Sequence, residues 1–159
     1  MTQPLHFALP FIAALGCGLM AGIFFAFSVF VMTALGRLPP AAGMAAMNAI
    51  NAAILNPLFF TLFFGTAALS LLSAIAAVVA WSVPSAFYLI GGGMLYLVGS
   101  LLVTVRFNVP LNQALAAAGA ESADGARLWS RYLAVWTAWN HVRTATSLAA
   151  TGCFILALG

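Results

Sequence analysis

The sequence is poor in charge. It contains five basic residues, all of them arginine, and two acidic residues among 159. Charged residues make up 4% of the chain and hydrophobic residues 65%, whereas an average soluble domain has roughly 25% charged residues. This composition excludes a water-soluble fold and predicts an integral membrane protein whose first partner is the lipid bilayer.

Three further absences narrow the function. There is no basic patch with interleaved aromatic residues, which excludes a nucleic-acid partner. Cys17 and Cys153 both lie in apolar runs without CxxC or Cys/His spacing, so they read as buried thiols rather than zinc ligands, and whether they come close is left open. No carboxylate lies within an apolar stretch, which argues against a proton-coupled transporter.

Four apolar stretches are long enough to cross a bilayer, at about 7–35, 58–81, 86–105 and 135–158. A bilayer core needs about 20 helical residues, and backbone hydrogen bonding in lipid leaves helix as the expected form. The predicted fold is therefore all-α, an antiparallel bundle of four transmembrane helices in a single membrane domain, 1–159.

The connections contain the helix-breaking residues. Pro39-Pro40 is expected to end a helix, 41–55 to form a short extra helix, and Asn56-Pro57 to begin the second span. The short turn at 82–85 makes spans two and three antiparallel. The loops are placed at about 36–57 and 106–134.

The arginines indicate orientation. Arg37 lies in the first connection, and Arg106, Arg127 and Arg131 lie in the third. The positive-inside rule places both connections in the cytoplasm and both termini outside, for a multi-pass protein of the cell membrane.

Small residues recur at every fourth position in the first span. They are Ala14, Gly18, Gly22 and Ala26, and the two glycines form a GxxxG motif. This spacing allows close helix contact, either within the bundle or in a homo-oligomer through Gly18 and Gly22. Gly91-Gly-Gly93 and Gly99 have the same character in the third span.

A polar stripe marks the last span. At about 100° per residue, Trp136, Arg143, Thr144 and Ser147 fall within about 60° of Asn140, and His141 lies at the edge of the stripe. A central arginine in a span costs about 2.5–3.5 kcal/mol on insertion scales, so such residues usually face a protein site. The alternative is that Arg143 snorkels to the interface, with Trp136 and Trp139 in the aromatic belt.

The predicted topology gathers polar groups at the cytoplasmic end of the bundle. They are Asn48, Asn51, Asn56, Asn108, Asn112, Asn140, Arg106, Arg143 and His141. With Met44 and Met47 on the short helix, this surface suits a small, flat, hydrophobic molecule with a few oxygens. The asparagines could instead cap helix ends, for which Asn56 and Asn112 are equally suited.

Four motifs together resemble one family. They are Ala21-Gly-Ile-Phe-Phe-Ala-Phe-Ser28 with Val31-Met32, Asn51 with Asn56-Pro57, Asn108-Val-Pro-Leu-Asn112, and Trp136-Thr-Ala-Trp-Asn-His-Val-Arg-Thr144. They resemble the small four-span membrane family of unknown function that includes the anthrone oxygenases, over nearly the whole chain. The resemblance implies oxidation of a flat phenolic or polyketide-like anthrone to an anthraquinone with molecular oxygen.

For that chemistry, His141 is the candidate base. Arg143, Asn140 and Asn108, with Arg106, are candidates to stabilise an oxyanion, and Trp136, Trp139, Met44 and Met47 to form apolar walls. Asn112, Asn48, Asn51 and Asn56 complete the candidate substrate site. No cofactor is strongly indicated. The alternatives are a haem or other cofactor bound through His141, and a transporter or accessory subunit for a lipophilic metabolite.

Overall fold

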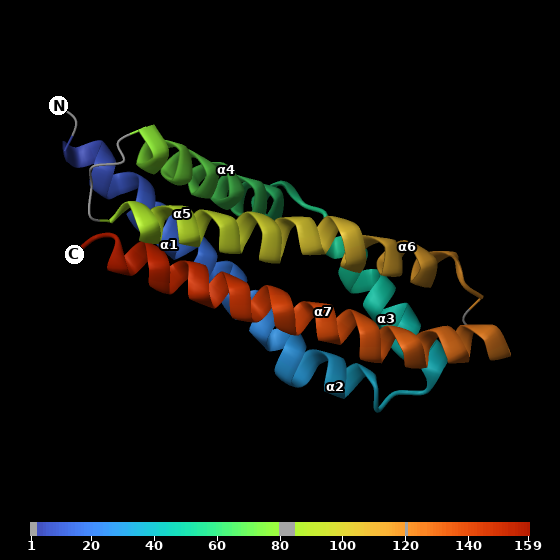
Figure 1. Cartoon of the computed structure of the whole chain (residues 1–159). Helices are drawn as coiled ribbons and strands as arrows, with labels where there is room; N and C mark the ends of the chain where they lie inside the picture. The colour runs from blue at the N-terminus through green and yellow to red at the C-terminus, as the bar shows by residue number, and fades with distance from the viewer. Residues whose placement is uncertain (1–2, 80–84, 120) are drawn as a thin grey trace.

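The computed structural model describes residues 3–79, 85–119 and 121–159, and this part of the chain is helical and contains no strand. The elements are α1 (Gln3–Ala26), η1 (Phe27–Val31), α2 (Met32–Leu35), α3 (Pro40–Ala53), α4 (Pro57–Val79), α5 (Ala86–Tyr96), η2 (Leu97–Leu102), η3 (Thr104–Asn108), α6 (Val109–Ala117) and α7 (Ala123–Leu156). The η segments are π-helical turns that continue their neighbouring α-helices, so α1 to α2 and α5 to α6 each form one long rod (Figure 1).

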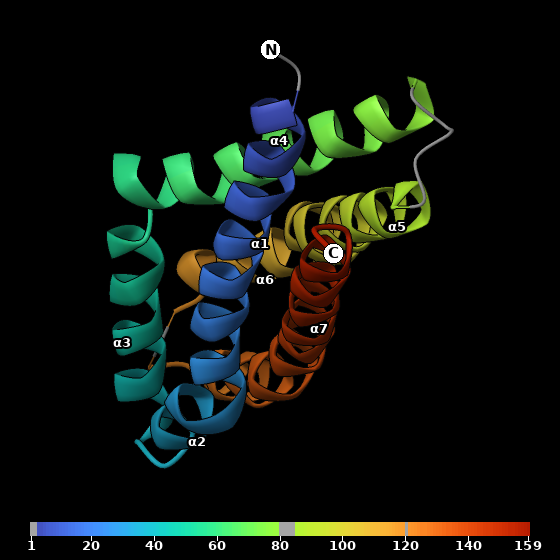
Figure 2. The ribbon, with the colours of Figure 1, turned by 90° about the vertical axis from the view of Figure 1, so that its left-hand side faces the viewer.

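The long helices pack in a closed order. α7 lies against both α1 and α5, and α4 lies against both α5 and α1. The short helix α3 stands at one end, where it contacts α6 and α7 (Figure 2). The all-helical prediction is confirmed.

Three helical stretches are long and apolar enough to cross a membrane: Phe7–Leu35, Pro57–Val79 and Ala86–Ala117. They coincide with the first three predicted spans and indicate a membrane protein. The third stretch continues past its expected end near residue 105, because η3 and α6 extend the helix.

The fourth predicted span lies within a longer and more polar helix. α7 has 34 residues, or about 51 Å at 1.5 Å per residue, so it begins well before the expected residue 135. α7 is absent from the described helices apolar enough to cross a membrane. The reason is that its mean hydropathy is lowered by residues such as Asn140 and Arg143, which are buried inside the protein.

Several local expectations need correction. The predicted loop 106–134 is mostly helical, with only 118–122 between α6 and α7. Pro40 starts α3 rather than ending the preceding helix, which stops at Leu35. The predicted turn at 82–85 falls mainly outside the described residues. The predicted short helix and the start at Pro57 are both found.

Glycines allow the α5–η2 rod to approach its neighbours closely. A Cβ atom at Gly99 would lie 2.4 Å from Thr146 Cγ2 on α7, and one at Gly93 would lie 2.9 Å from the Ser70 carbonyl oxygen on α4. In α1, a Cβ atom at Gly18 would lie 3.7 Å from Thr151 Cγ2, whereas one at Gly22 would have no neighbour within 4 Å. Gly18, Gly93 and Gly99 therefore serve packing within the chain.

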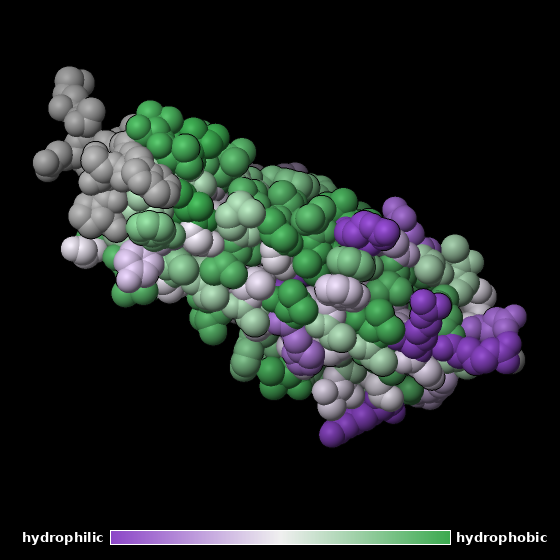
Figure 3. Space-filling model, in the orientation of Figure 1, coloured by the Kyte–Doolittle hydropathy of each residue, from purple (hydrophilic) through white to green (hydrophobic). Residues whose placement is uncertain are grey.

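Two hydrophobic clusters fill the interior. One joins α1, α4, α5 and α7 around Met20, Phe24, Tyr96 and Phe154. The other joins α2, α3, α6 and α7 around Met44, Met47, Leu115, Tyr132 and Trp136. On the face shown in Figure 3, hydrophilic residues gather mainly at the end formed by α6 and the beginning of α7, while the middle is largely hydrophobic.

Candidate functional site

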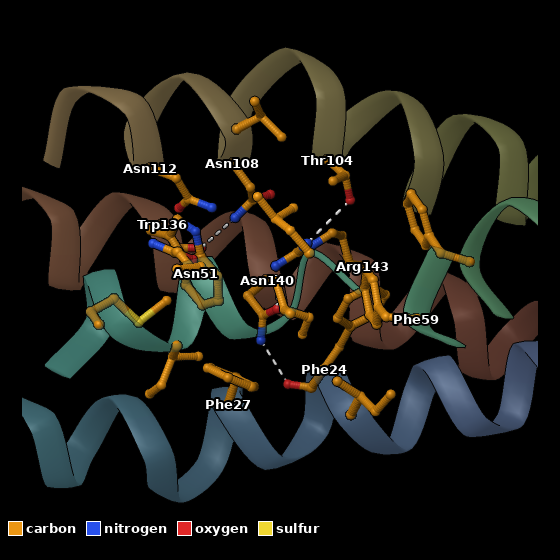
Figure 4. A pocket seen from close by; sticks show the side chains of 18 of the residues that line it. Phe24, Phe27, Asn51, Phe59, Thr104, Asn108, Asn112, Trp136, Asn140 and Arg143 are labelled. Carbon is orange, nitrogen blue, oxygen red and sulfur yellow. Dashed lines mark hydrogen bonds between the residues drawn. The ribbon is translucent and has the colours of Figure 1, made fainter. Parts of the chain in front are cut away.

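A cavity of about 480 Å³ lies where the two clusters meet. Its lining comes from α1 and η1 (23–27), α3 (47–52), α4 (59–64), η3 and α6 (104–116) and α7 (136–143). Aromatic and aliphatic side chains form most of the wall, and a few polar groups reach it from different helices (Figure 4). A largely apolar cavity with a few converging polar groups is the usual form of a small-molecule site.

Arg143 is the only charged residue in this lining. Its side chain is 5% exposed, although it belongs to α7 and lies among hydrophobic helices. Both acidic residues of the chain, Glu121 and Asp124, are exposed at the start of α7, and Asp124 pairs with Arg127. The buried guanidinium therefore has no carboxylate partner among the described residues.

Neutral groups hold the guanidinium in place. Arg143 Nη2 donates to Asn140 Oδ1 across 2.6 Å, and Nη1 donates to Thr104 Oγ1 across 3.1 Å. The guanidinium carbon lies 4.3 Å from the centroid of the Phe24 ring and 5.1 Å from that of Trp136, within cation–π range. These contacts fix the position of the charge but do not neutralise it.

Asn140 connects α7 to the first helix. Its Nδ2 donates to the Phe24 carbonyl oxygen at 2.6 Å and to Ser28 Oγ at 2.7 Å. Ser28 Oγ also lies 3.2 Å from Thr144 Oγ1. Because a carbonyl oxygen can only accept, the Asn140 amide must turn its nitrogen to α1 and its oxygen to Arg143.

Asn108 makes the corresponding link between η3 and α7. Its Nδ2 donates to the Trp136 carbonyl oxygen at 3.2 Å, and its side chain is 2% exposed. One turn further, Tyr132 donates to Asn112 Oδ1 at 2.7 Å.

Several polar atoms of the lining residues lack a hydrogen-bond partner in the described structure although they are buried. They include Asn108 Oδ1, Trp136 Nε1, Arg143 Nε and Asn48 Oδ1. Buried polar atoms without partners are costly in a folded protein, so their concentration around one cavity indicates a ligand site.

Three of the residues that hydrogen-bond to α7 around the cavity lie in π-helical turns. Ser28 lies in η1, and Thr104 and Asn108 lie in η3. π-helical turns are rare and frequently mark functional sites, because the extra residue changes which side chains share a face. Here they bring Ser28 to Asn140 and place Thr104 and Asn108 beside α7.

The cavity has an apolar rim that is exposed on the outside of the helices. Leu55 is 65% exposed, Phe64 50% and Val105 56%, and all three line the cavity. In a bilayer, side chains of this kind face lipid tails. Part of the cavity lining therefore reaches the outer surface between α3–α4 and η3–α6, where these side chains are hydrophobic.

Most of the residues predicted for the site do meet. The cavity is lined by Arg143, Asn140, Asn108, Trp136, Asn112, Asn48, Asn51 and Met47. They come from three separate helical segments.

Five other predicted residues lie elsewhere. His141 is exposed on α7, because it falls about 100° from Asn140 around the helix, and it does not line the cavity. Arg106 is also exposed, with its guanidinium carbon 5.6 Å from the Phe107 ring centroid, and Trp139 stacks on Phe107 at 3.8 Å. These positions do not support direct contact with a ligand in the cavity.

The other two predicted residues have structural contacts. Asn56 caps α4, since the Phe59 N–H donates to its Oδ1 at 3.0 Å. Met44 is buried in the core cluster with Trp129 and Tyr132, behind the lining.

The lining also contains residues that were not predicted, among them Thr104, Phe24 and Phe59, and Ser28 lies beside it in contact with Asn140. Thr104 lies four residues before Asn108, so the polar spacing Thr104, Asn108, Asn112 was a usable signal. Ser28 belongs to the 21–28 motif that contributes to the family resemblance. Phe24 and Phe59 gave no distinct signal, because a phenylalanine in an apolar helix can equally face lipid.

The fold and the site define a helical membrane protein with a buried cation in an apolar cavity. A family model described as anthrone oxygenase matches residues 59–153, more than half of the chain. The chain therefore belongs to the anthrone oxygenase family. The matched range contains Thr104, Asn108, Trp136, Asn140 and Arg143. No curated protein and no solved structure matches the chain.

Proposed function

We propose that this protein is a four-span membrane oxidoreductase in which α7 is the fourth span. In this proposal, the cavity binds a flat, hydrophobic phenolic or polyketide-like substrate and the bound substrate reacts with O2. The observation that carries the proposal is the buried, unneutralised charge of Arg143 in an otherwise apolar wall. The family membership supports the oxygenase class.

Arg143 favours a ligand with a negative or electron-rich oxygen. Burying a cation without a counter-ion is unfavourable, and an oxyanion beside it recovers much of that loss in a low-dielectric site. Thr104 and Asn140 each accept one hydrogen bond from the guanidinium, while Arg143 Nε has no hydrogen-bond partner among the described residues. An enolate or phenolate oxygen suits this position.

The reaction fits what the cavity provides. An anthrone has an acidic methylene group, and its enolate can transfer an electron to O2 and then form a carbon–oxygen bond. Loss of water from the resulting peroxide converts the methylene carbon to a carbonyl, so one oxygen atom is retained and the other leaves as water. Arg143 would stabilise the enolate oxygen, which lowers the free energy of the reacting form.

The cavity does not supply a conventional base. Its lining contains no histidine, carboxylate, cysteine or lysine. We infer that the site acts by favouring the ionised form of an acidic substrate, with the proton passing to water at the hydrophilic end of the cavity, where Gln113 of the lining is exposed. The role predicted for His141 is thus replaced by Arg143, acting on the substrate's acidity.

The apolar rim suggests how the substrate reaches the cavity. A flat hydrophobic molecule partitions into the bilayer, and the exposed side chains of Leu55, Phe64 and Val105 would admit it from there. In this proposal the arginine-rich end of the molecule is the cytoplasmic one. The termini would then lie outside.

The test is anthrone-dependent oxygen uptake by protein reconstituted in lipid, with the anthraquinone product followed by absorbance. Arg143→Met keeps the length of the side chain and removes the charge, and we expect it to lower kcat by about 100-fold or more. Arg106→Met is the matched control, because Arg106 is exposed and outside the cavity. Oxygen uptake that persists in Arg143→Met would contradict the proposed role of the charge.

A further inference from the structure

We propose that Asn108 selects substrates that carry a free hydroxyl group. This inference rests on the proposed function of the cavity and concerns a second contact, separate from Arg143. It starts from the orientation of one amide.

The Asn108 amide can be oriented on chemical grounds. Its Nδ2 donates to the Trp136 carbonyl oxygen at 3.2 Å. A backbone carbonyl has no proton to give, so the amide cannot be reversed without losing this bond. The Oδ1 atom is consequently left facing away from α7's backbone.

Asn108 Oδ1 has no hydrogen-bond partner among the described residues. The side chain is 2% exposed and belongs to the cavity lining. An amide oxygen can only accept, so the ligand group that completes it must be a donor. In a phenolic or polyketide-like molecule, that donor is a hydroxyl.

Trp136 makes the same region suitable for a hydroxyl oxygen. Its indole Nε1 is buried without a partner in the described structure, and it can only donate. A hydroxyl group both donates and accepts, so it can satisfy either Asn108 Oδ1 or Trp136 Nε1. A carbonyl or methoxy group could satisfy only the indole.

This arrangement predicts discrimination between a hydroxyl compound and its methyl ether. A ligand that cannot donate leaves the buried Oδ1 unsatisfied, and such sites reject the analogue more strongly than apolar pockets do. We therefore expect the methyl ether to bind at least about tenfold more weakly.

The test uses 2-hydroxyfluorenone and 2-methoxyfluorenone, two flat tricyclic ketones that differ only in this group. Their dissociation constants would be measured by quenching of tryptophan fluorescence with the full-length protein in nanodiscs. Asn108→Leu removes the amide while keeping a side chain that branches at Cγ. Asn56→Leu makes the same change at an exposed helix cap that lines an adjoining cavity but not this one.

We expect Asn108→Leu to weaken the hydroxyl compound about tenfold and to leave the methyl ether within about twofold of wild type. Asn56→Leu should keep the wild-type preference. Equal affinity of wild-type protein for both compounds, or equal weakening of both in Asn108→Leu, would overturn the inference and leave the proposed function in place. Failure of both compounds to bind the wild type would overturn the proposed cavity function and this inference together.

Discussion

Arg143 and Asn140 lie one helical turn apart on α7, and Arg143 Nη2 donates to Asn140 Oδ1 across 2.6 Å. The same amide donates to the Phe24 carbonyl oxygen of α1. Asn140 thus holds the guanidinium at a fixed position relative to a second helix. Since it does so without adding negative charge, the cation stays available to a ligand.

Asn140→Asp should therefore impair function more than a neutral replacement does. The aspartate would lie next to Arg143 and form an ion pair, which cancels the field that stabilises a substrate oxyanion. We expect kcat/KM for an anthrone to fall by at least about tenfold relative to Asn140→Ala.

Asn140→Ala is the matched comparison, because it loses the contacts with Phe24 and Ser28 but leaves the charge of Arg143 intact. Both variants would be compared at equal amounts of folded protein in lipid. Equal kcat/KM values for the two variants would show that Asn140 acts through packing alone.

His141 provides a second contrast on the same helix. It is exposed and outside the cavity, so His141→Ala should keep kcat within about twofold of wild type, as surface substitutions usually do. Oxygen uptake by equal amounts of folded wild-type and variant protein in lipid would check this. Loss of activity in His141→Ala would restore the histidine as the base.

The sequence predicted which way the polar side chains of α7 point, but not which residues of the other helices they contact. Periodicity placed Trp136, Asn140, Arg143 and Ser147 on one stripe of the last span, and all four are buried in the structure. Helix periodicity fixes the angle of a side chain around its own axis. It does not state which residue of another helix stands opposite.

That limit explains why some predicted residues lie outside the cavity lining. His141 lies at the edge of the stripe, and only the position of α1 and η3 shows that this edge is exposed. Arg106 lies in η3, where the π-helical turn changes the angle between successive side chains. Phe24 and Phe59 line the cavity, but nothing in an apolar sequence separates a lining phenylalanine from a lipid-facing one.

The glycine contacts predict a difference in stability. Gly99→Ala would place a methyl group 2.4 Å from Thr146 Cγ2, and overpacking of this kind typically costs about 1–3 kcal/mol of unfolding free energy. Gly22→Ala introduces the same methyl group where nothing lies within 4 Å. Thermal unfolding in detergent should show a lower Tm for Gly99→Ala and no decrease for Gly22→Ala.

An unchanged Tm in Gly99→Ala would mean that α5–η2 and α7 can separate without loss. A decrease in Gly22→Ala would point to a second copy of the chain covering that face of α1. The oligomeric state of the two variants in detergent would show whether a second copy covers α1.

The hydrophobic rim predicts that substrate entry can be obstructed from the lipid side. Val105 is 56% exposed and lines the cavity, whereas Val98, on the same rod, is 45% exposed and lies outside the lining. Val105→Trp should narrow the opening and lower kcat/KM for an anthrone several-fold, because passage through the opening precedes every turnover. Val98→Trp adds the same bulk to the lipid-facing surface and should leave kcat/KM unchanged. Measurements in proteoliposomes would compare the two, and equal kcat/KM values would place the entry route elsewhere, between the helices at the hydrophilic end.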